Sequence, residues 1–137
     1  MNSFSRTIDL VHRGMNVSNL RHSVYANNLS NQGVPNFKRT EVNFEASLKK
    51  ALLSERYRPE FVMAQSDPRH ISNWNPVDYR NVEPRRVLDF TTTYNNNGNN
   101  VDPESEMNKL LENQMRYTLY AKAAAFQYSQ VALVLRA

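Results

Sequence analysis

The feature that most constrains this chain is an apolar repeat near its C-terminal end. From residue 107 to residue 135, positions that alternate spacings of three and four carry mostly apolar side chains. That spacing places side chains on one helical face and is typical of a coiled-coil seam. A helix over 102–137 is therefore predicted, with Asp102 as its cap and Pro103 in its first turn. The seam positions are Met107, Leu110, Gln114, Tyr117, Ala121, Ala124, Tyr128, Val131 and Leu135.

A second long helix is predicted over residues 1–32. Pro35 prevents its continuation, because proline lacks an amide hydrogen and disfavours helical geometry in the residue before it, and Gly33 supplies a stop. Apolar residues on two different faces predict that this helix contacts more than one neighbour. One face carries Phe4, Ile8, Val11 and Met15, and the other carries Leu10, Val17 and Val24.

The middle of the chain has weaker signals. Asn43 is expected to cap a short helix that runs to about Ser54, within a segment 33–57 that also holds a loop. Prolines interrupt the segment 58–101, where residues 86–94 are the strand-like run. Five Asn residues surround Gly98 at 95–100 and predict a turn or a flexible joint.

These elements predict a mainly α fold. Long N- and C-terminal helices pack as a coiled-coil-like pair, and the loop-rich middle segment contains a little β structure. The apolar fraction of 40% is low for a globular chain of 137 residues, so one domain over 1–137 is expected, with no large core.

The apolar faces of the two helices have two interpretations. In the first, they are simply the core of an intramolecular helix pair. In the second, they exceed what the pair can cover, and the remainder contacts other subunits. A further series in the last helix favours the second interpretation, because it lies off the seam: Leu119, Phe126 and Leu133.

Residue types that carry chemistry are sparse. The chain has no Cys, and no two of His12, His22 and His70 stand three or four residues apart, as metal ligands on one helical face would. Three Gly residues form no phosphate-binding pattern. No catalytic, cofactor-binding or metal-binding residue is predicted, although a small hydrolase that depends on His70 is a competing hypothesis.

Charge and hydropathy bear on the partners. A net charge of +4 leaves a basic helical nucleic-acid-binding protein as an alternative, but the basic residues are spread out, which favours a solvated or partner-facing surface. Residues 1–20 mix charged and apolar side chains, so no cleaved signal peptide is expected. The most apolar stretch, 117–135, is too short and too polar for direct membrane insertion.

Two motifs carry a resemblance to a known family. Residues 26–31 read ANNLSN and residues 33–39 read GVPNFKR. This resembles the signature of flagellar axial proteins, whose usual form is Ala-Asn-x-Leu-Ala-Asn, a short spacer, and Thr-Pro-Gly-Tyr-Lys. Ser30, Val34, Asn36 and Phe37 depart from that form, and Asn36 can adopt the left-handed backbone that Gly would supply.

The second motif reads GNNVD at residues 98–102, followed by Glu106-Met107, Asn113-Gln114 and Tyr117. It resembles the pattern of the proximal rod proteins of the bacterial flagellar basal body. The resemblance implies a single rod-type domain and a structural subunit that polymerises, is exported by the flagellar type III apparatus, and helps to transmit torque from the ring to the distal rod and hook. The implied location is the periplasmic rod, and the implied partners are other rod proteins, the ring-to-rod adaptor, the membrane ring and further copies.

An assembly interface is predicted from the first motif and from the seam of the last helix. Asn27, Asn28 and Asn31 are expected to hydrogen-bond the turn and neighbouring backbone, although simple helix capping explains them equally well. Pro35 is expected to fix the direction in which the chain leaves the helix. The motif residues of this interface are Ala26, Asn27, Asn28, Leu29, Asn31, Pro35 and Phe37, and the nine seam positions complete it.

Overall fold

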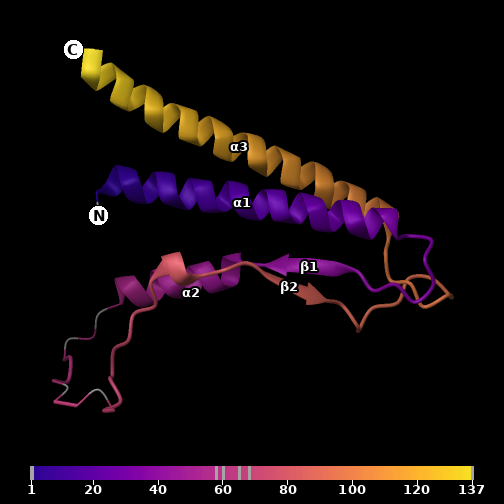
Figure 1. The fold of residues 1–137 in the computed structure, drawn as a ribbon, viewed down its shortest axis with the longest axis horizontal. Helices are drawn as coiled ribbons and strands as arrows, with labels where there is room; N and C mark the ends of the chain where they lie inside the picture. Colours follow the sequence, from indigo (N-terminus) through magenta and orange to yellow (C-terminus); the bar gives the residue numbers. More distant parts are fainter. Residues whose placement is uncertain (1, 58, 60, 65, 68, 137) are drawn as a thin grey trace. The chain divides into compact units, whose positions relative to one another are not determined.

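A computed structural model describes residues 2–57, 59, 61–64, 66–67 and 69–136. The chain divides into two compact units. The first combines Met1–Val42 with Arg86–Ala137, and the second is Asn43–Arg85. Figure 1 shows the long helices of the first unit side by side, with the two chain ends at the same end of the pair.

The first unit is built on α1 (Ser3–Ser30) and α3 (Pro103–Arg136), which pack against each other along their lengths. Asn2 caps α1 by accepting a hydrogen bond from the amide of Phe4 at 3.4 Å. Asp102 caps α3 by accepting from the amide of Glu104 at 3.0 Å. The predicted pair of long terminal helices is confirmed, as is the predicted role of Asp102.

The chain reverses direction after α1 through Asn36. Asn31 is the C-cap residue, and Asn36 has a φ of 59°, in the left-handed region. The prediction that Asn36 replaces a glycine there is confirmed, because Asn tolerates this backbone better than most residues. α1 ends at Ser30, two residues before the predicted limit at residue 32. The left-handed residue is Asn36, which lies after Gly33, the residue predicted to stop the helix.

All but the last residue of β1 (Thr40–Asn43) and the first residue of β2 (Arg85–Leu88) belong to the first unit as well, and the two strands form a two-stranded sheet and point in opposite directions in Figure 1. β2 stops well before Tyr94, so the strand-like run is shorter than expected. Asp89 explains the stop, because its carboxylate accepts hydrogen bonds from the amides of Thr91 and Thr92 and turns the chain. Local side-chain bonding overrides the β propensity of the threonines.

The second unit contains α2 (Glu45–Arg56) and a short 3-10 helix, η1 (Tyr79–Asn81). The predicted short helix is present, but Phe44 occupies the cap position and makes no side-chain cap bond, so Asn43 does not cap it. The Ser54 hydroxyl accepts from the amide of Val77 at 2.9 Å, which ties the return segment to α2. Ala51 and Tyr79 are buried where α2 and η1 meet.

Polar side chains make up much of what the first unit buries. Its buried apolar residues are Val17, Val24, Val42, Val101 and Ala124, and its buried polar residues are Ser18, Asn28, Asn99, Asn100, Glu106 and Asn113. Within the described residues, every buried side-chain nitrogen and oxygen has a hydrogen-bond partner. This unit is therefore held in register by directional bonds as well as by apolar packing.

Candidate assembly interface

The middle of the α1–α3 interface is a reciprocal pair of polar residues. Ser18 donates its hydroxyl to Oδ1 of Asn113 at 2.9 Å, and Nδ2 of Asn113 donates to the carbonyl of Ser18 at 2.8 Å. Both side chains are buried, so a shift of either helix along the other would leave these groups without partners. The pair fixes the sliding register of the two helices.

Small and aromatic residues fit together between that pair and the chain ends. A Cβ on Gly14 would lie 3.0 Å from Cζ of Tyr120, so the absence of a side chain at Gly14 lets the Tyr120 ring lie against α1. Nearer the chain ends, the rings of Phe4 and Tyr128 meet edge to face, with centroids 6.3 Å apart. Together these contacts show that α1 and α3 run in opposite directions.

The face of α3 toward α1 therefore lies beside the predicted seam. Buried or half-buried positions on this face include Glu106, Leu110, Asn113, Tyr120 and Ala124, whereas Gln114 and Ala121 are exposed. Leu110 and Ala124 lie on this face and are also predicted seam positions. Apolar spacing does not reveal this face of α3, because two features other than apolar side chains position it against α1. Asn113 forms hydrogen bonds with Ser18, and the missing side chain of Gly14 makes room for Tyr120.

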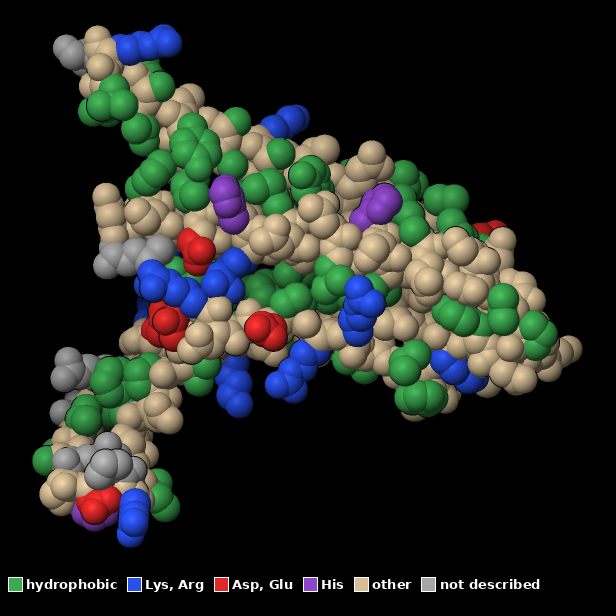
Figure 2. All heavy atoms as spheres, viewed as in Figure 1, with side chains coloured by type: hydrophobic (Ala, Val, Ile, Leu, Met, Phe, Trp, Pro, Cys, Tyr) green, Lys and Arg blue, Asp and Glu red, His purple; other side chains and the backbone are tan. Residues whose placement is uncertain are grey.

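Much of the apolar surface of α3 stays open to solvent. Figure 2 shows hydrophobic side chains along the exposed surface of α3. Among the predicted seam positions, Met107, Tyr117, Tyr128, Val131 and Leu135 are exposed, as are Leu119, Phe126 and Leu133 of the series off the seam. Isolated exposed apolar residues are common, but a helix with this many is typical of an interaction surface.

At the other end of the helix pair, Asn28 joins three parts of the chain. Its Nδ2 donates to the carbonyl of Thr40 and to Oε2 of Glu106, both at 2.9 Å, and its Oδ1 accepts from the amide of Thr40 at 3.0 Å. The buried amide thus bonds β1 as a neighbouring strand would and also holds the first turn of α3. Asn28 does more than cap its own helix.

The two sequence motifs meet at this junction. Nδ2 of Asn99 donates to the carbonyls of Asn31, Gln32 and Val34 at 2.8–3.0 Å, and its Oδ1 accepts from the amide of Val101 at 2.7 Å. These carbonyls lie just past the end of α1, where helical partners are missing. Of the two alternatives predicted for 95–100, a turn or a flexible joint, the turn is confirmed, and Asn99 in it is fully buried.

A close backbone approach locks the two turns together. The amide of Asn36 donates to the carbonyl of Asn97 at 3.0 Å, and Nζ of Lys38 donates to the carbonyl of Gly98 at 2.8 Å. Gly98 has a φ of +80°, and a Cβ there would lie 2.6 Å from Oδ1 of Asn36. Glycine suits position 98 because it adopts this left-handed backbone without strain, whereas a Cβ there would also require the Asn36 side chain to move.

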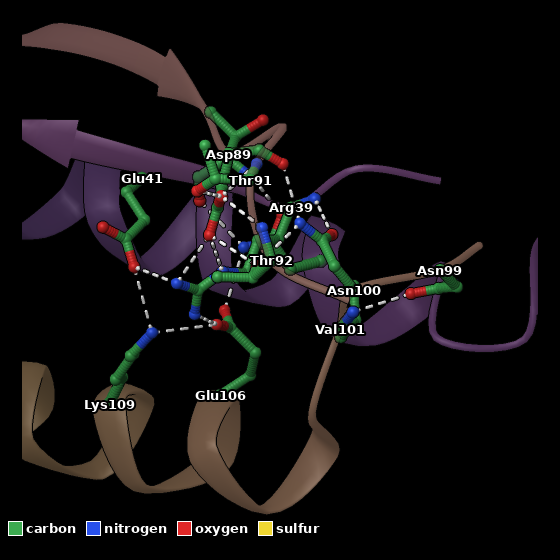
Figure 3. Close-up of polar contacts among 12 residues, drawn as sticks. Arg39, Glu41, Asp89, Thr91, Thr92, Asn99, Asn100, Val101, Glu106 and Lys109 are labelled. Atoms are coloured by element: carbon green, nitrogen blue, oxygen red, sulfur yellow. Dashed lines mark hydrogen bonds and ion pairs between the residues drawn. The ribbon is translucent and has the colours of Figure 1, made fainter. Parts of the chain in front are cut away.

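Charged residues form a network beside these turns, drawn in Figure 3. The Arg39 guanidinium pairs with Asp89 at 2.9 Å, with Glu41 at 3.2 Å and, less closely, with Glu106 at 3.7 Å. Lys109 lies 3.2 Å from both Glu41 and Glu106, which balances the buried Glu106 carboxylate. The network connects β1, the segment after β2 and the first turns of α3.

Asp89 accepts several hydrogen bonds within this network. The Thr92 hydroxyl donates to it at 2.7 Å, the amides of Thr91 and Thr92 donate as well, and Arg39 lies beside it. These bonds hold the pKa of Asp89 well below its ordinary value of 3.8, with the Thr92 hydroxyl the largest cause. Asp89 is therefore a charged anchor for the turn that follows β2.

Tyr25 lines a polar hollow of about 270 Å³ beside this network. Burial raises the pKa of the Tyr25 hydroxyl, with Arg21 and Lys109 opposing that shift. Arg21 also donates to the carbonyl of Val42 at 3.1 Å, which holds β1 against α1. The charges around the hollow are of both signs, so they balance each other within the chain.

The motif residues of the predicted interface occupy different environments. Asn28 is buried, Ala26, Leu29, Asn31 and Phe37 are half-buried, and Asn27 and Pro35 are exposed. Asn31 makes a local bond, since its Nδ2 donates to the carbonyl of Asn27 at 2.8 Å. The predicted bonds to neighbouring backbone are therefore present for Asn28, and local capping describes Asn31.

Sequence reasoning missed the residues that join the two motifs. The sequence places Asn99 and Asn100 in a turn or a flexible joint, and it indicates no shared role for Arg39, Asp89 and Glu106. Asn100 donates to the carbonyl of Asp89 at 2.7 Å and accepts from the amide of Arg39 at the same distance. The available signal was the GNNVD motif itself, in which two consecutive amide side chains precede a helix cap.

The described part of the chain offers no group of His, Cys, Asp and Glu that could hold a metal ion. Among the same residues, no helix is both long enough and apolar enough to cross a membrane. The arrangement defines the class of protein: an antiparallel helix pair closed by interlocked turns, with apolar helix surface left open.

Comparisons with known proteins identify the family. No protein-family model matches the chain. It is 41% identical to the flagellar basal body rod protein FlgB of Borreliella burgdorferi, over 99% of this chain and 100% of that protein. It is 39% identical to FlgB of Borrelia hermsii, with the same coverage, and 29% identical to FlgB of Bacillus subtilis, over 98% of this chain and 97% of that one. The chain belongs to the FlgB family of flagellar basal body rod proteins, which confirms the resemblance seen in the motifs.

Proposed function

We propose that this chain is a structural, non-catalytic subunit of the proximal rod of the flagellar basal body. It polymerises through its terminal helices and helps to transmit torque from the ring to the distal rod and hook. It is exported without a cleaved signal peptide and assembles in the periplasmic space. Its partners there are other rod proteins, the ring-to-rod adaptor, the membrane ring and further copies of itself. The family membership supports the location, and the helix surfaces support the mechanism.

One observation carries the proposal. Leu119, Phe126 and Leu133 stand seven residues apart on α3, and their exposed fractions are 65%, 60% and 64%. They lie on one face of α3 that α1 leaves uncovered, and we call these three residues the stripe. Burying one such side chain contributes about 1.5–3 kcal/mol, so a neighbouring helix that covers the stripe gains substantial stabilisation.

The junction of the two motifs suits a subunit that bears load. Asn28, Asn99 and Arg39 each bond at least two separate segments, so a force applied to one helix reaches the other through directional contacts. Fully satisfied polar networks rigidify the segments that they join. A rod subunit needs a rigid junction between its helices and, along α3, an apolar surface that binds a neighbour.

The nucleic-acid-binding alternative receives no support from the charges. Arg13, Arg39, Lys109 and Arg116 each pair with a carboxylate of the chain itself. Their positive charge is partly neutralised within the chain, whereas a nucleic-acid-binding surface presents cations to phosphate.

Replacement of the central stripe residue tests the proposal. Phe126→Asp removes an apolar contact without disturbing the α1–α3 interface, and the matched control Thr118→Asp adds the same charge at an exposed position on a different face of α3. We expect Phe126→Asp to reduce the amount of this protein in purified basal bodies at least tenfold and to abolish swimming, while Thr118→Asp retains both. Normal swimming of the Phe126→Asp strain would refute polymerisation through this stripe.

A further inference from the structure

The turn that locks the two motifs together contains the only Asn-Gly dipeptide of the chain, Asn97-Gly98. Asparagine is a chemically labile residue, and it is most reactive before glycine. Glycine has no Cβ, so nothing hinders the approach of its amide nitrogen to Cγ of the asparagine. Asn97 is exposed, so water and hydroxide reach it. The dipeptide therefore has both the composition and the access to solvent that deamidation needs.

Deamidation at this site requires water and no enzyme. The amide nitrogen of Gly98 loses its proton to hydroxide and attacks Cγ of Asn97. The new C–N bond closes a succinimide ring, and the side-chain nitrogen leaves as ammonia after it takes a proton from water. Water then opens the ring at either carbonyl, which gives an aspartate or an isoaspartate at position 97. One water molecule is consumed and one ammonia is released, with no oxidation or reduction.

Hydrogen bonds of the folded turn hold both reacting groups. The amide of Gly98 donates to the carbonyl of Asn95 at 3.1 Å, so the proton that must leave is already bonded. Oδ1 of Asn97 accepts from the amide of Asn99 at 3.0 Å, which fixes the side chain. The backbone carbonyl of Asn97 accepts from the amide of Asn36 at 3.0 Å, which fixes the peptide between the two reacting residues. Loss of the proton, or rotation of either group, costs one of these bonds.

We propose that Asn97 is a deamidation site that folding protects: the unfolded chain modifies itself there, and the interlocked turns prevent the reaction in the folded chain. None of the three bonds is held in an unfolded chain, so the Asn97 side chain and the Gly98 nitrogen can meet freely. The inference goes beyond the proposed function and does not depend on it, because it concerns a single chain before any partner binds.

The isoaspartate product changes the backbone of the turn. Its link to Gly98 runs through the former side chain, so the backbone is one carbon longer, and the former backbone carbonyl of Asn97 becomes a charged carboxylate. That carbonyl is the acceptor for the amide of Asn36, and the Gly98 carbonyl that follows is the acceptor for Nζ of Lys38 at 2.8 Å. The modified chain should therefore form the junction of the two motifs poorly. Time spent unfolded is recorded at position 97.

Incubation of the natural chain with and without guanidinium chloride tests the protection. Both samples are kept at the same pH and temperature, digested at intervals, and analysed by mass spectrometry for peptides deamidated at Asn97. The rate should be at least tenfold higher in the denaturant. Equal rates would overturn the inference. Gly98→Ala in the denaturant is the chemical control, because its methyl group should slow the reaction at least tenfold, and an unchanged rate would contradict attack by this nitrogen.

Variants that loosen the turn test whether its bonds give the protection. Asn99→Ala removes the side chain that holds the end of α1, so the rate at Asn97 without denaturant should rise at least fivefold. Lys38→Ala, which removes only the bond to the Gly98 carbonyl, is the milder variant and should raise the rate about twofold. Asn96→Ala, exposed in the same turn, should leave it unchanged. Rates equal to that of the natural chain in both Asn99→Ala and Lys38→Ala would overturn protection by the turn.

Refolding after incubation tests the consequence. The natural chain and Asn97→Gln, whose longer side chain forms the corresponding ring much more slowly, are kept in the denaturant for the same time and then diluted. The folded fraction of each is measured by circular dichroism relative to its own fresh sample. The natural chain should lose folded protein in proportion to its isoaspartate content, while Asn97→Gln should recover fully. Equal recovery of the two chains would overturn the effect of the modification on the junction.

Discussion

The two ends of the α1–α3 pair differ in how much of their side-chain surface is buried. At the junction of the motifs, Asn28, Asn99 and Glu106 are almost fully buried, and their polar groups are bonded within the chain. At the other end, Val134 and Leu135 are mostly exposed. Folding of the chain alone buries the residues at the junction, whereas the residues at the other end stay exposed unless another molecule covers them. Substitutions at the junction should therefore alter stability, and substitutions at the α3 end should alter assembly alone.

The largest effect is expected at Asn99. Asn99→Asp keeps the oxygen that accepts from Val101 but replaces the amide donor with a carboxylate oxygen facing three carbonyls. A buried, unpaired charge costs about 4 kcal/mol of unfolding free energy at neutral pH. Urea unfolding followed by circular dichroism measures it, with Asn99→Ala, expected to lose about 2 kcal/mol, as the milder variant.

Position 96 provides the control for Asn99, because Asn96 lies in the same turn and is exposed. Asn96→Asp should change the unfolding free energy by no more than about 0.5 kcal/mol. Equal losses at positions 96 and 99 would mean that the turn is sensitive to charge in general, and the interlocked arrangement would lose its support.

The next effect is expected at Asn28. Asn28→Ala removes two hydrogen bonds with Thr40 and one with Glu106, and the groups left behind are buried or partly buried. The loss should be about 3 kcal/mol of unfolding free energy. Asn27→Ala, one residue earlier on the exposed side of α1, should cost less than about 0.5 kcal/mol in the same assay. A similar cost for both variants would reduce Asn28 to a helix residue without a joining role.

Much of this fold was accessible from the sequence because long helices carry strong signals. The helix signals are local: they are the spacings of three and four residues, the cap at Asp102 and the break at Pro35. Each depends only on residues that are close together in the sequence. The family motifs marked the two turns correctly and placed the left-handed residue at Asn36. They could do so because each motif lies at a helix boundary.

The contacts between distant segments were not accessible in the same way. Ser18 and Asn113 are 95 positions apart, and neither has a neighbour that reveals the other. The Asn-rich stretch at 95–100 predicts either a turn or a flexible joint because Asn has low helix propensity. Asn99 and Asn100 decide for an ordered turn by donating to carbonyls elsewhere in the chain. Polar residues that act as long-range partners and polar residues in loose loops look alike in sequence.

Acid should weaken the junction selectively through Asp89. Its pKa is lowered in the folded chain, so its contribution to stability is fully present above the ordinary value of 3.8 and is lost as pH falls from there toward the folded pKa. Asp89→Asn cannot titrate at this position. The difference in unfolding free energy between the natural chain and Asp89→Asn should therefore shrink below about pH 3.8. A difference that stays constant across that range would exclude Asp89 as a charged anchor.

The smallest effect on folding is expected at the end of α3. Leu135→Asp exchanges a side chain that is 80% exposed, so the unfolding free energy of the dilute protein should change by less than about 0.5 kcal/mol. Ala124→Asp, three turns earlier on the same helix but only 8% exposed, should lose several times as much because its carboxylate would face α1. If Leu135→Asp destabilised the dilute protein as Ala124→Asp does, the last turns of α3 would be covered within their own subunit. Both ends of the helix pair would then be buried within the chain, and there would be no reason to expect a neighbouring molecule at the end of α3.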